Sequence, residues 1–264
     1  MSNSQNNKDV DFNYININNN PTNQARNNDE GLNLIDKEDI ELGYDYKKTL
    51  EYALRIGFIR KVYGILSIQL LLTVFMCALT FIDSVRYFFL HNMWLFFTTV
   101  ILSIAIIIPL LCIKDLARRV PTNYILLLLW TFCEAYMVAT CCANYDPIIV
   151  LEAVFLTCAV TISLTIYACT TKTDFTVCGG MLFVMICLLL CLGILSIFLP
   201  FLNTLYCVCG VLVYSIYLLY DTQLIMGKFG NEYEIDDYII AAIMIYIDII
   251  QIFLYLLQLL GDRR

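Results

Sequence analysis

Two aspartates stand inside apolar segments of the sequence, where an ionised side chain is costly. Asp248 interrupts the run "IYIDIIQIF" (245–253), and Asp221 follows "YSIYLLY" (214–220). A charge at the centre of a membrane costs at least about 2.5–3.5 kcal/mol, and intramembrane ionisable groups usually serve a function. If two carboxyl groups lie close together in a poorly hydrated site, they cannot both ionise easily, so they share one proton and titrate as a unit. This pattern predicts a proton sensor, and carboxylate oxygens also suit a hard cation such as Ca²⁺.

The chain that holds these aspartates is much more hydrophobic than a soluble protein. Of its 264 residues, 60% are hydrophobic and 15% are charged, whereas a soluble domain is about half apolar and about a quarter charged. Residues 1–50 differ from the rest, because they are polar and rich in asparagine. This segment has too few apolar side chains to offset the entropy of ordering. We therefore expect a disordered, Asn-rich cytosolic tail at residues 1–50.

Almost all apolar residues after the tail fall into blocks long enough to cross about 30 Å of hydrocarbon. The seven blocks are Phe58–Ile82, Met93–Ile113, Pro121–Cys141, Ile148–Cys169, Val177–Leu199, Thr204–Ile225 and Tyr238–Leu260. The connections between them are short and leave no room for a second folded domain. We predict an all-α membrane protein in which residues 51–264 form a seven-transmembrane-helix bundle surrounded by the lipid bilayer.

The distribution of lysine and arginine predicts the orientation of this bundle, because cytosolic loops are enriched in positive charge. With a cytosolic N-terminus, the opposite side carries only Arg86 and the terminal Arg263 and Arg264. The basic residues on the predicted cytosolic side are Lys47, Lys48, Arg55, Arg60, Lys61, Lys114, Arg118, Arg119, Lys172 and Lys228. We expect a multi-pass integral membrane protein with its N-terminus in the cytosol.

The last apolar block carries a polar stripe. Asp248 is followed at helical spacing by Gln251, Tyr255 and Gln258, and residues at these intervals lie on one helix face. Polar side chains of a membrane helix face the bundle interior rather than lipid. The stripe therefore directs Asp248 toward neighbouring helices, and Gln251 and Tyr255 are candidates for lining a cavity.

Asp221 is expected to meet Asp248 from the preceding helix. A short connection containing Gly227 and Gly230 joins the sixth and seventh blocks. Such an antiparallel hairpin can hold the two aspartates at similar depths. Tyr217 lies one turn before Asp221 on the same face, so it is a further candidate for cavity lining.

Other charged residues have two interpretations each. Glu134, in "TFCEAYMV" (131–138), either lines a cavity or hydrogen-bonds a neighbouring helix. Glu152 is close enough to the end of its block to reach the membrane surface. Arg118 or Arg119 could reach the ionised aspartates as a latch, or could anchor a helix at the interface.

Cysteine and histidine do not indicate a metal site. The twelve cysteines lie mostly inside the apolar blocks without a C-x-x-C pair, and the one histidine, His91, is in a predicted loop. Buried cysteine packs as a small hydrophobic residue, whereas structural zinc needs four well-placed ligands. We expect no cofactor and no nucleic-acid partner, with Ca²⁺ as a permeant ion that binds transiently at Asp221 and Asp248.

Several segments resemble a known family. "FIRKVYGILSIQLLLT" (58–73), "TKTDFTVCGGMLFV" (171–184), "YDTQLIMGK" (220–228) and "DDYIIAAIMIYIDIIQIFLYLLQLLG" (236–261) resemble the Bax inhibitor-1 superfamily and its Lifeguard branch. "FCEAYMVA" (132–139) and "LNTLYCVCGVLVYSIYLLYDTQ" (202–223) are most similar to the Golgi anti-apoptotic member of that branch. The resemblance covers the chain from about residue 55 to its end, so it includes every predicted membrane helix.

The resemblance implies a seven-helix bundle of Bax inhibitor-1 type with the seventh helix at the centre. It implies that Asp221 and Asp248 form a di-aspartyl pH sensor and gate, latched by Arg119, with Arg118 as the near alternative. It also implies a pH-sensitive Ca²⁺ leak from the Golgi or the endoplasmic reticulum that regulates Ca²⁺ homeostasis and suppresses cell death. The implied partners are Ca²⁺, protons and cell-death regulatory proteins.

Two other functions remain as alternatives. An intramembrane aspartyl protease would also use two aspartates on helices six and seven, one as base and one as acid. Such proteases carry Gly-x-Gly-Asp on helix seven, where this chain has Ile245-Tyr246-Ile247-Asp248, so we do not expect an enzyme. The other alternative is a non-transporting membrane scaffold that binds death regulators through the tail or the acidic loop Glu232–Asp237.

Overall fold

The computed structural model describes residues 21–230 and 233–261, and only the backbone of residues 21–41 and 43 is considered. The chain divides into two units, residues 1–52 and 53–264. Helix α1 (Pro21–Leu79) begins in the first unit and continues into the second. Residues 21–50 are therefore helical where their composition predicts disorder. A helix nucleated in an apolar span can propagate into preceding residues at little further cost. The predicted disorder of residues 1–20 lies outside the described residues.

The described part of the second unit consists of helices, with no strand among its residues. After α1 the helices are α2 (Asp83–His91), α3 (Met93–Cys112), α4 (Lys114–Arg118), α5 (Thr122–Cys142), α6 (Pro147–Thr170), α7 (Gly179–Phe198), α8 (Asn203–Met226) and α9 (Tyr238–Leu260). Short 3₁₀ turns at Thr176–Cys178 and Pro200–Leu202 precede α7 and α8. Seven of the described helices are long and apolar enough to span a membrane. The predicted seven-helix membrane bundle is confirmed.

The boundaries of the spans agree closely with the apolar blocks, with one main exception at the start of the first. That span extends over Tyr44–Leu79, because the helix continues through polar residues that the hydropathy pattern excludes. Two short helices, α2 and α4, lie in connections where only loops were expected. His91 is consequently the last residue of α2 rather than part of a loop, and its side chain is exposed.

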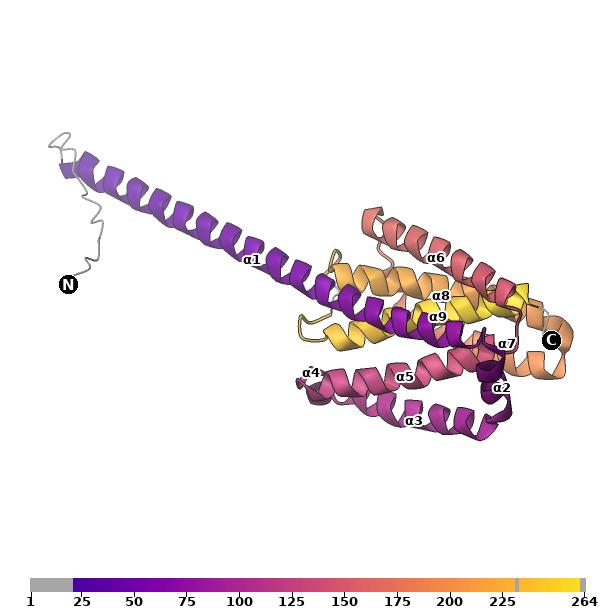
Figure 1. Cartoon of the computed structure of the whole chain (residues 1–264). Helices are drawn as coiled ribbons and strands as arrows, with labels where there is room; N and C mark the ends of the chain where they lie inside the picture. Colours follow the sequence, from indigo (N-terminus) through magenta and orange to yellow (C-terminus); the bar gives the residue numbers. More distant parts are fainter. Residues whose placement is uncertain (1–20, 231–232, 262–264) are drawn as a thin grey trace, which may run out of the picture. The chain divides into compact units, whose positions relative to one another are not determined.

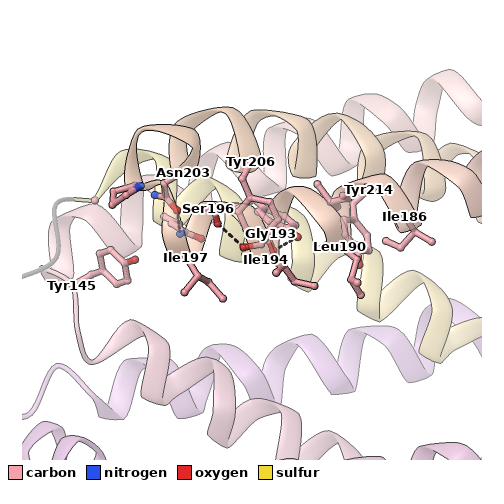
Figure 2. Close-up of a pocket in the computed structure, with 15 residues that line it drawn as sticks. Tyr145, Ile186, Leu190, Gly193, Ile194, Ser196, Ile197, Asn203, Tyr206 and Tyr214 are labelled. Carbon is pink, nitrogen blue, oxygen red and sulfur yellow. Dashed lines mark hydrogen bonds between the residues drawn. The ribbon is translucent and has the colours of Figure 1, made fainter.

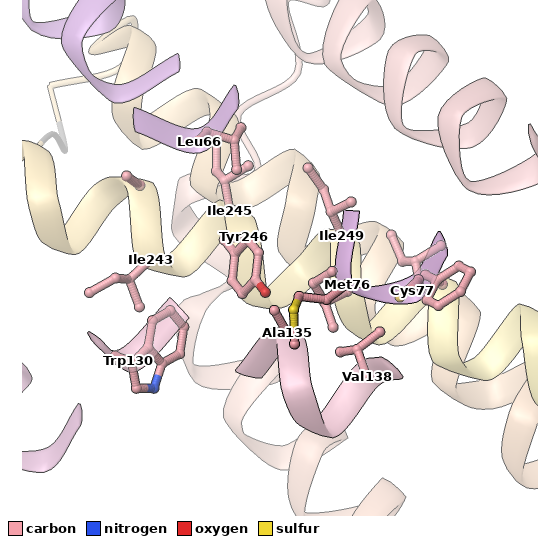
Figure 3. Close-up of a cluster of buried hydrophobic side chains, with 14 of the residues drawn as sticks. Leu66, Met76, Cys77, Trp130, Ala135, Val138, Ile243, Ile245, Tyr246 and Ile249 are labelled. Carbon is pink, nitrogen blue, oxygen red and sulfur yellow. The ribbon is translucent and has the colours of Figure 1, made fainter. Parts of the chain in front are cut away.

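Helix α9 lies at the centre of the second unit. It packs against α5, α6 and α8, as Figure 1 shows for the yellow helix, and it is the most buried of the seven spans. Trp130 of α5 packs edge-on against Tyr246 of α9, with ring centroids 5.5 Å apart, inside an apolar cluster (Figure 3). The predicted central position of the seventh helix is confirmed.

Polar contacts between helices also hold α1 in the bundle. Gln69 of α1 donates a hydrogen bond of 3.0 Å to the hydroxyl of Thr131 on α5. Thr73 of α1 and Tyr246 of α9 share a hydrogen bond of 2.8 Å between their hydroxyl groups. Hydrogen bonds between membrane helices contribute about 0.6–2 kcal/mol each. Together with the apolar cluster, these contacts keep α9 enclosed.

Candidate functional site

The hairpin between α8 and α9 positions the two aspartates. Helix α8 ends at Met226 and is capped by Gly227, which has a left-handed backbone (φ 64°) and whose N–H bonds the carbonyl of Gln223 at 3.0 Å. Gly230 follows with φ 82°, a region that residues with a Cβ adopt at a steric cost. The hairpin expected from these two glycines is present, and α8 and α9 pack along each other.

Asp221 of α8 and Asp248 of α9 lie together in the interior of this hairpin. Their side chains are only 6% and 3% exposed, and the two carboxyl groups lie within hydrogen-bonding reach of each other. Two carboxyl groups bond each other only through a shared proton, and with that proton in place the pair carries at most one negative charge. The Oδ2 atom of Asp248 is buried without a hydrogen-bond partner among the described residues.

Tyr233, in the loop after α8, contacts the aspartate pair from the hairpin loop. Its hydroxyl donates a 3.4 Å hydrogen bond to Oδ1 of Asp221. The guanidinium of Arg55 on α1 donates a 3.0 Å hydrogen bond to the backbone carbonyl of Tyr233, which holds the residue in place. Burial, followed by the nearby Asp221 carboxylate, raises the pKa of Tyr233. The phenol therefore stays protonated and acts as a donor.

The two candidate latch arginines have different surroundings. Arg118 is half-buried and bonds Oδ1 of Asp237 at 2.8 Å and Oε2 of Glu234 at 2.6 Å. Hydrogen bonds to Asp237 and then to Glu234 raise the pKa of Arg118, so this side chain remains charged. Arg119 is exposed. The carboxylates that Arg118 contacts belong to the hairpin loop, and neither is Asp221 or Asp248. The latch therefore stays a prediction.

The polar stripe of α9 faces the bundle interior and borders two cavities. The larger one, here called the tyrosine cavity, has a volume of about 960 Å³ and lies between α7, α8 and α9 (Figure 2). Tyr255 and Gln258 of the stripe line it. A side cavity of about 390 Å³ is lined by Gln251, Tyr255 and Gln258. All three stripe residues after Asp248 thus line one or both of these cavities.

Tyrosines connect the larger cavity to the aspartate pair. Tyr214 of α8 lines the tyrosine cavity and interacts electrostatically with Asp248. Tyr217 interacts electrostatically with both aspartates, and its hydroxyl donates a 3.0 Å hydrogen bond to the carbonyl of Leu182 on α7. The face of α8 that the helical spacing predicted is therefore the face turned toward the pair.

Glu134 lies away from this site. Its Oε1 accepts a 2.6 Å hydrogen bond from the hydroxyl of Ser103 on α3, which ties α5 to the neighbouring helix. Glu134 lines neither the tyrosine cavity nor the side cavity. Glu152 of α6 is exposed. The structure thus presents Glu134 in a contact between helices, one of its two interpretations.

The described residues contain no cluster of three or more His, Cys, Asp or Glu side chains that could hold a metal ion. Two carboxyl groups with one shared proton provide too few ligands for tight Ca²⁺ binding, since Ca²⁺ takes six to eight oxygens.

Comparisons with known proteins agree with the sequence segments described above. Residues 55–264 match the family described as "Inhibitor of apoptosis-promoting Bax1". The chain belongs to this family. A human protein named "Protein lifeguard 3" is 40% identical over 217 residues, which cover 80% of this chain and 70% of the human protein. "Protein LIFEGUARD 3" of Arabidopsis thaliana is 36% identical over 245 residues, 85% of this chain and 94% of that protein. The predicted membership of the family and its Lifeguard branch is confirmed.

Several contacts in this member of the family were not expected from the sequence. Tyr233 stands in the acidic stretch "NEYEIDDY", which indicates only a solvated loop. Gln223 accepts a 2.8 Å hydrogen bond from the N–H of Phe175 and donates one of 2.9 Å to the carbonyl of Thr173. Tyr206 bonds Tyr255 from the start of α8. Only the tyrosine spacing on α8 offered a signal, since loop contacts have no periodicity. Glu232, part of the predicted acidic surface, lies outside the described residues.

Proposed function

We propose that the protein is a pH-sensitive pathway for Ca²⁺ leak across an intracellular membrane, with Asp221 and Asp248 as its proton sensor and gate. The observation that carries this proposal is the close approach of two buried carboxyl groups enclosed in a membrane bundle. Such groups are expensive to place in a membrane and are rare outside ion or proton pathways. The proposal needs no cofactor, because the carboxyl groups themselves bind the proton and attract the cation.

The direction of the pH response follows from the number of bound protons. In the closed arrangement the pair holds at least one proton in its shared hydrogen bond. In the open state we propose that both carboxyl groups are ionised, repel each other and separate. The closed state then binds one more proton than the open state, so rising pH shifts the equilibrium toward opening by up to about tenfold per pH unit. The two ionised groups provide oxygen ligands for Ca²⁺.

The hairpin loop provides the second part of the mechanism. In the closed arrangement the Arg118 guanidinium is engaged by Glu234 and Asp237. We propose that the ionised aspartate pair competes with the loop carboxylates for an arginine, either Arg118 or Arg119, which then acts as the latch. If the arginine left Glu234 and Asp237, the loop that carries Tyr233 would lose these ionic contacts and become more mobile. The loop and the pair would therefore change together.

The location and biological role are part of the same proposal. The excess of Lys and Arg on one side supports a cytosolic N-terminus, and we propose the Golgi or the endoplasmic reticulum as the membrane. The family description, "Inhibitor of apoptosis-promoting Bax1", supports a role in suppressing cell death through Ca²⁺ homeostasis. We propose cell-death regulatory proteins as partners on that ground.

Ca²⁺ flux into liposomes tests the proposed activity. The purified protein is reconstituted with a Ca²⁺ indicator inside, and initial rates are measured between about pH 6 and 8, where a shared buried proton is expected to be lost. We expect flux that rises with pH in the wild type and is nearly independent of pH in Asp248→Asn. Glu152→Gln is the matched control, because it removes an exposed carboxylate of α6 and should retain the wild-type profile. Equal pH dependence in the wild type and Asp248→Asn would exclude this mechanism.

A further inference from the structure

The tyrosine cavity lies toward the end of the bundle opposite the hairpin loop. Its lining includes Pro200 and Asn203, where α7 gives way to α8, and Gly261 after the end of α9. Aliphatic side chains of α7, such as Leu190 and Ile194, form one side (Figure 2). Near Asn203, the Gln258 amide donates a 2.7 Å hydrogen bond to Oδ1 of Asn203. Polar side chains of membrane helices usually face the bundle interior or a water-filled cavity.

A series of neighbouring tyrosine rings leads from this cavity toward the aspartate pair. The ring of Tyr255 lies 5.2 Å from that of Tyr206 and 5.9 Å from that of Tyr214, and Tyr214 lies 5.9 Å from Tyr217. Tyr214 and Tyr217 are the residues that interact electrostatically with Asp248. Asp248 precedes Tyr255 by seven residues on α9, about 10 Å along the helix axis. These rings form an aromatic layer beside the cavity; Tyr214 belongs to this layer and also interacts with Asp248, whereas neither aspartate is part of the cavity lining.

Tyr255 is held in this layer from two sides. Its hydroxyl donates a 3.0 Å hydrogen bond to the hydroxyl of Tyr206. Its ring rests on the backbone of α8 at Gly210, where an added Cβ would come within 2.6 Å of the ring. The buried Cys207 packs in one apolar cluster with Leu189 and Tyr255. Gly210 and Tyr206 are thus positioning residues for Tyr255.

The side cavity provides space into which the Tyr255 ring can move. The side cavity shares Tyr145, Tyr206, Tyr255 and Gln258 with the tyrosine cavity, so these side chains form the wall between the two. Gln251, one turn from Asp248 on α9, lines the side cavity. A rotation of Tyr255 would join the two spaces along the polar stripe without displacing a helix.

We propose that Tyr255 is the barrier between the tyrosine cavity and the aspartate pair, and that hydrated cations pass it only when its side chain turns aside. Apolar ring faces exclude a hydrated ion, as hydrophobic constrictions do in channels. This inference rests on the proposed leak function, because a barrier to cations has a role only in a protein that conducts them. Whether Tyr255 blocks the access of a cation to the interior is tested without measuring Ca²⁺ flux.

The test measures access to Cys207, whose side chain is 0% exposed. The full-length protein in liposomes is treated with the small cationic reagent aminoethyl methanethiosulfonate, and the modified fraction of Cys207 is followed by peptide mass spectrometry. In Tyr255→Ala we expect modification about tenfold faster than in the wild type, since the covering ring and its hydrogen bond are gone. Tyr255→Phe is the matched variant: it keeps the ring on Gly210 and should remain within about threefold of the wild type.

Gly210→Ala provides a second route to the same result, because the added Cβ pushes the Tyr255 ring away without replacing any residue that lines the cavity. It should also accelerate the modification of Cys207, with folding verified by gel filtration and circular dichroism. Unchanged Cys207 reactivity in folded Gly210→Ala and Tyr255→Ala would overturn the inference. Ca²⁺ flux is measured on the same samples. Faster modification of Cys207 without Ca²⁺ flux in any sample supports the barrier and contradicts the leak function. Flux that depends on pH, with unchanged modification of Cys207, supports the leak function and contradicts the barrier.

Discussion

Replacing Asp248 by asparagine and by alanine separates the charge of this residue from its hydrogen bond. The Asp221–Asp248 hydrogen bond needs a donor on the Asp248 side when Asp221 is ionised. Asparagine provides an N–H donor of nearly the same size and cannot titrate, so Asp248→Asn reproduces the singly protonated pair. Alanine removes the donor and leaves the Tyr233 hydroxyl as the described hydrogen-bond partner of Asp221.

The size of the difference follows from the kind of hydrogen bond lost. A hydrogen bond to a charged group contributes about 1.5–3 kcal/mol, and 1.36 kcal/mol corresponds to a factor of ten. If this bond holds the closed state, its loss raises the open fraction about 10- to 150-fold. At the pH where wild-type flux is lowest, we therefore expect Asp248→Ala to leak Ca²⁺ about 10- to 150-fold faster than Asp248→Asn.

The assay is the initial rate of Ca²⁺ entry into liposomes that hold equal amounts of each variant, measured across the pH range. Asp248→Asn should give a flat profile, because neither its closed nor its open state exchanges the shared proton. Protein-free liposomes and Glu152→Gln provide the baselines. Equal rates for the asparagine and alanine variants, or a wild-type slope in Asp248→Asn, would refute the argument that a shared proton closes the pathway.

Three further predictions concern the surroundings of the pair. Arg118→Gln should increase amide exchange in residues 233–237, because Arg118 holds Glu234 and Asp237, whereas Arg119→Gln should not; equal effects would contradict this assignment. Gln223→Ala leaves the partly buried N–H of Phe175 and the carbonyl of Thr173 without their partner, which should cost about 1–3 kcal/mol and lower the melting temperature in detergent, and a melting temperature unchanged from the wild type would argue against it. Glu134→Gln keeps an acceptor for Ser103 and should change stability by less than about 1 kcal/mol, whereas Glu134→Ala should cost about 1–3 kcal/mol; comparable melting temperatures for these two variants would show that the hydrogen bond contributes little.

Much of the fold follows directly from local sequence patterns. Apolar block length places the membrane helices within a few residues, since crossing the hydrocarbon core requires about 20 residues of helix. The stripe from Asp248 to Gln258 predicts the inward face of α9, because helical periodicity relates residues that are close in the chain. The same local reasoning misses the helical backbone before residue 50 and the short helices α2 and α4, whose formation depends on neighbouring helices rather than on hydropathy.

The same distinction between local patterns and distant contacts applies to the candidate site. Residue type and spacing are enough to identify the residues that are costly in a membrane, Asp221 and Asp248, and the glycine-containing hairpin between their helices. The folded bundle was needed to show that the two carboxyl groups approach each other, that Tyr233 donates to Asp221 and that Arg118 contacts the loop. These contacts depend on the rotation of α8 against α9 and on the course of an aperiodic loop. Both are set by the packing of side chains from distant parts of the chain, and no spacing within one helix encodes them.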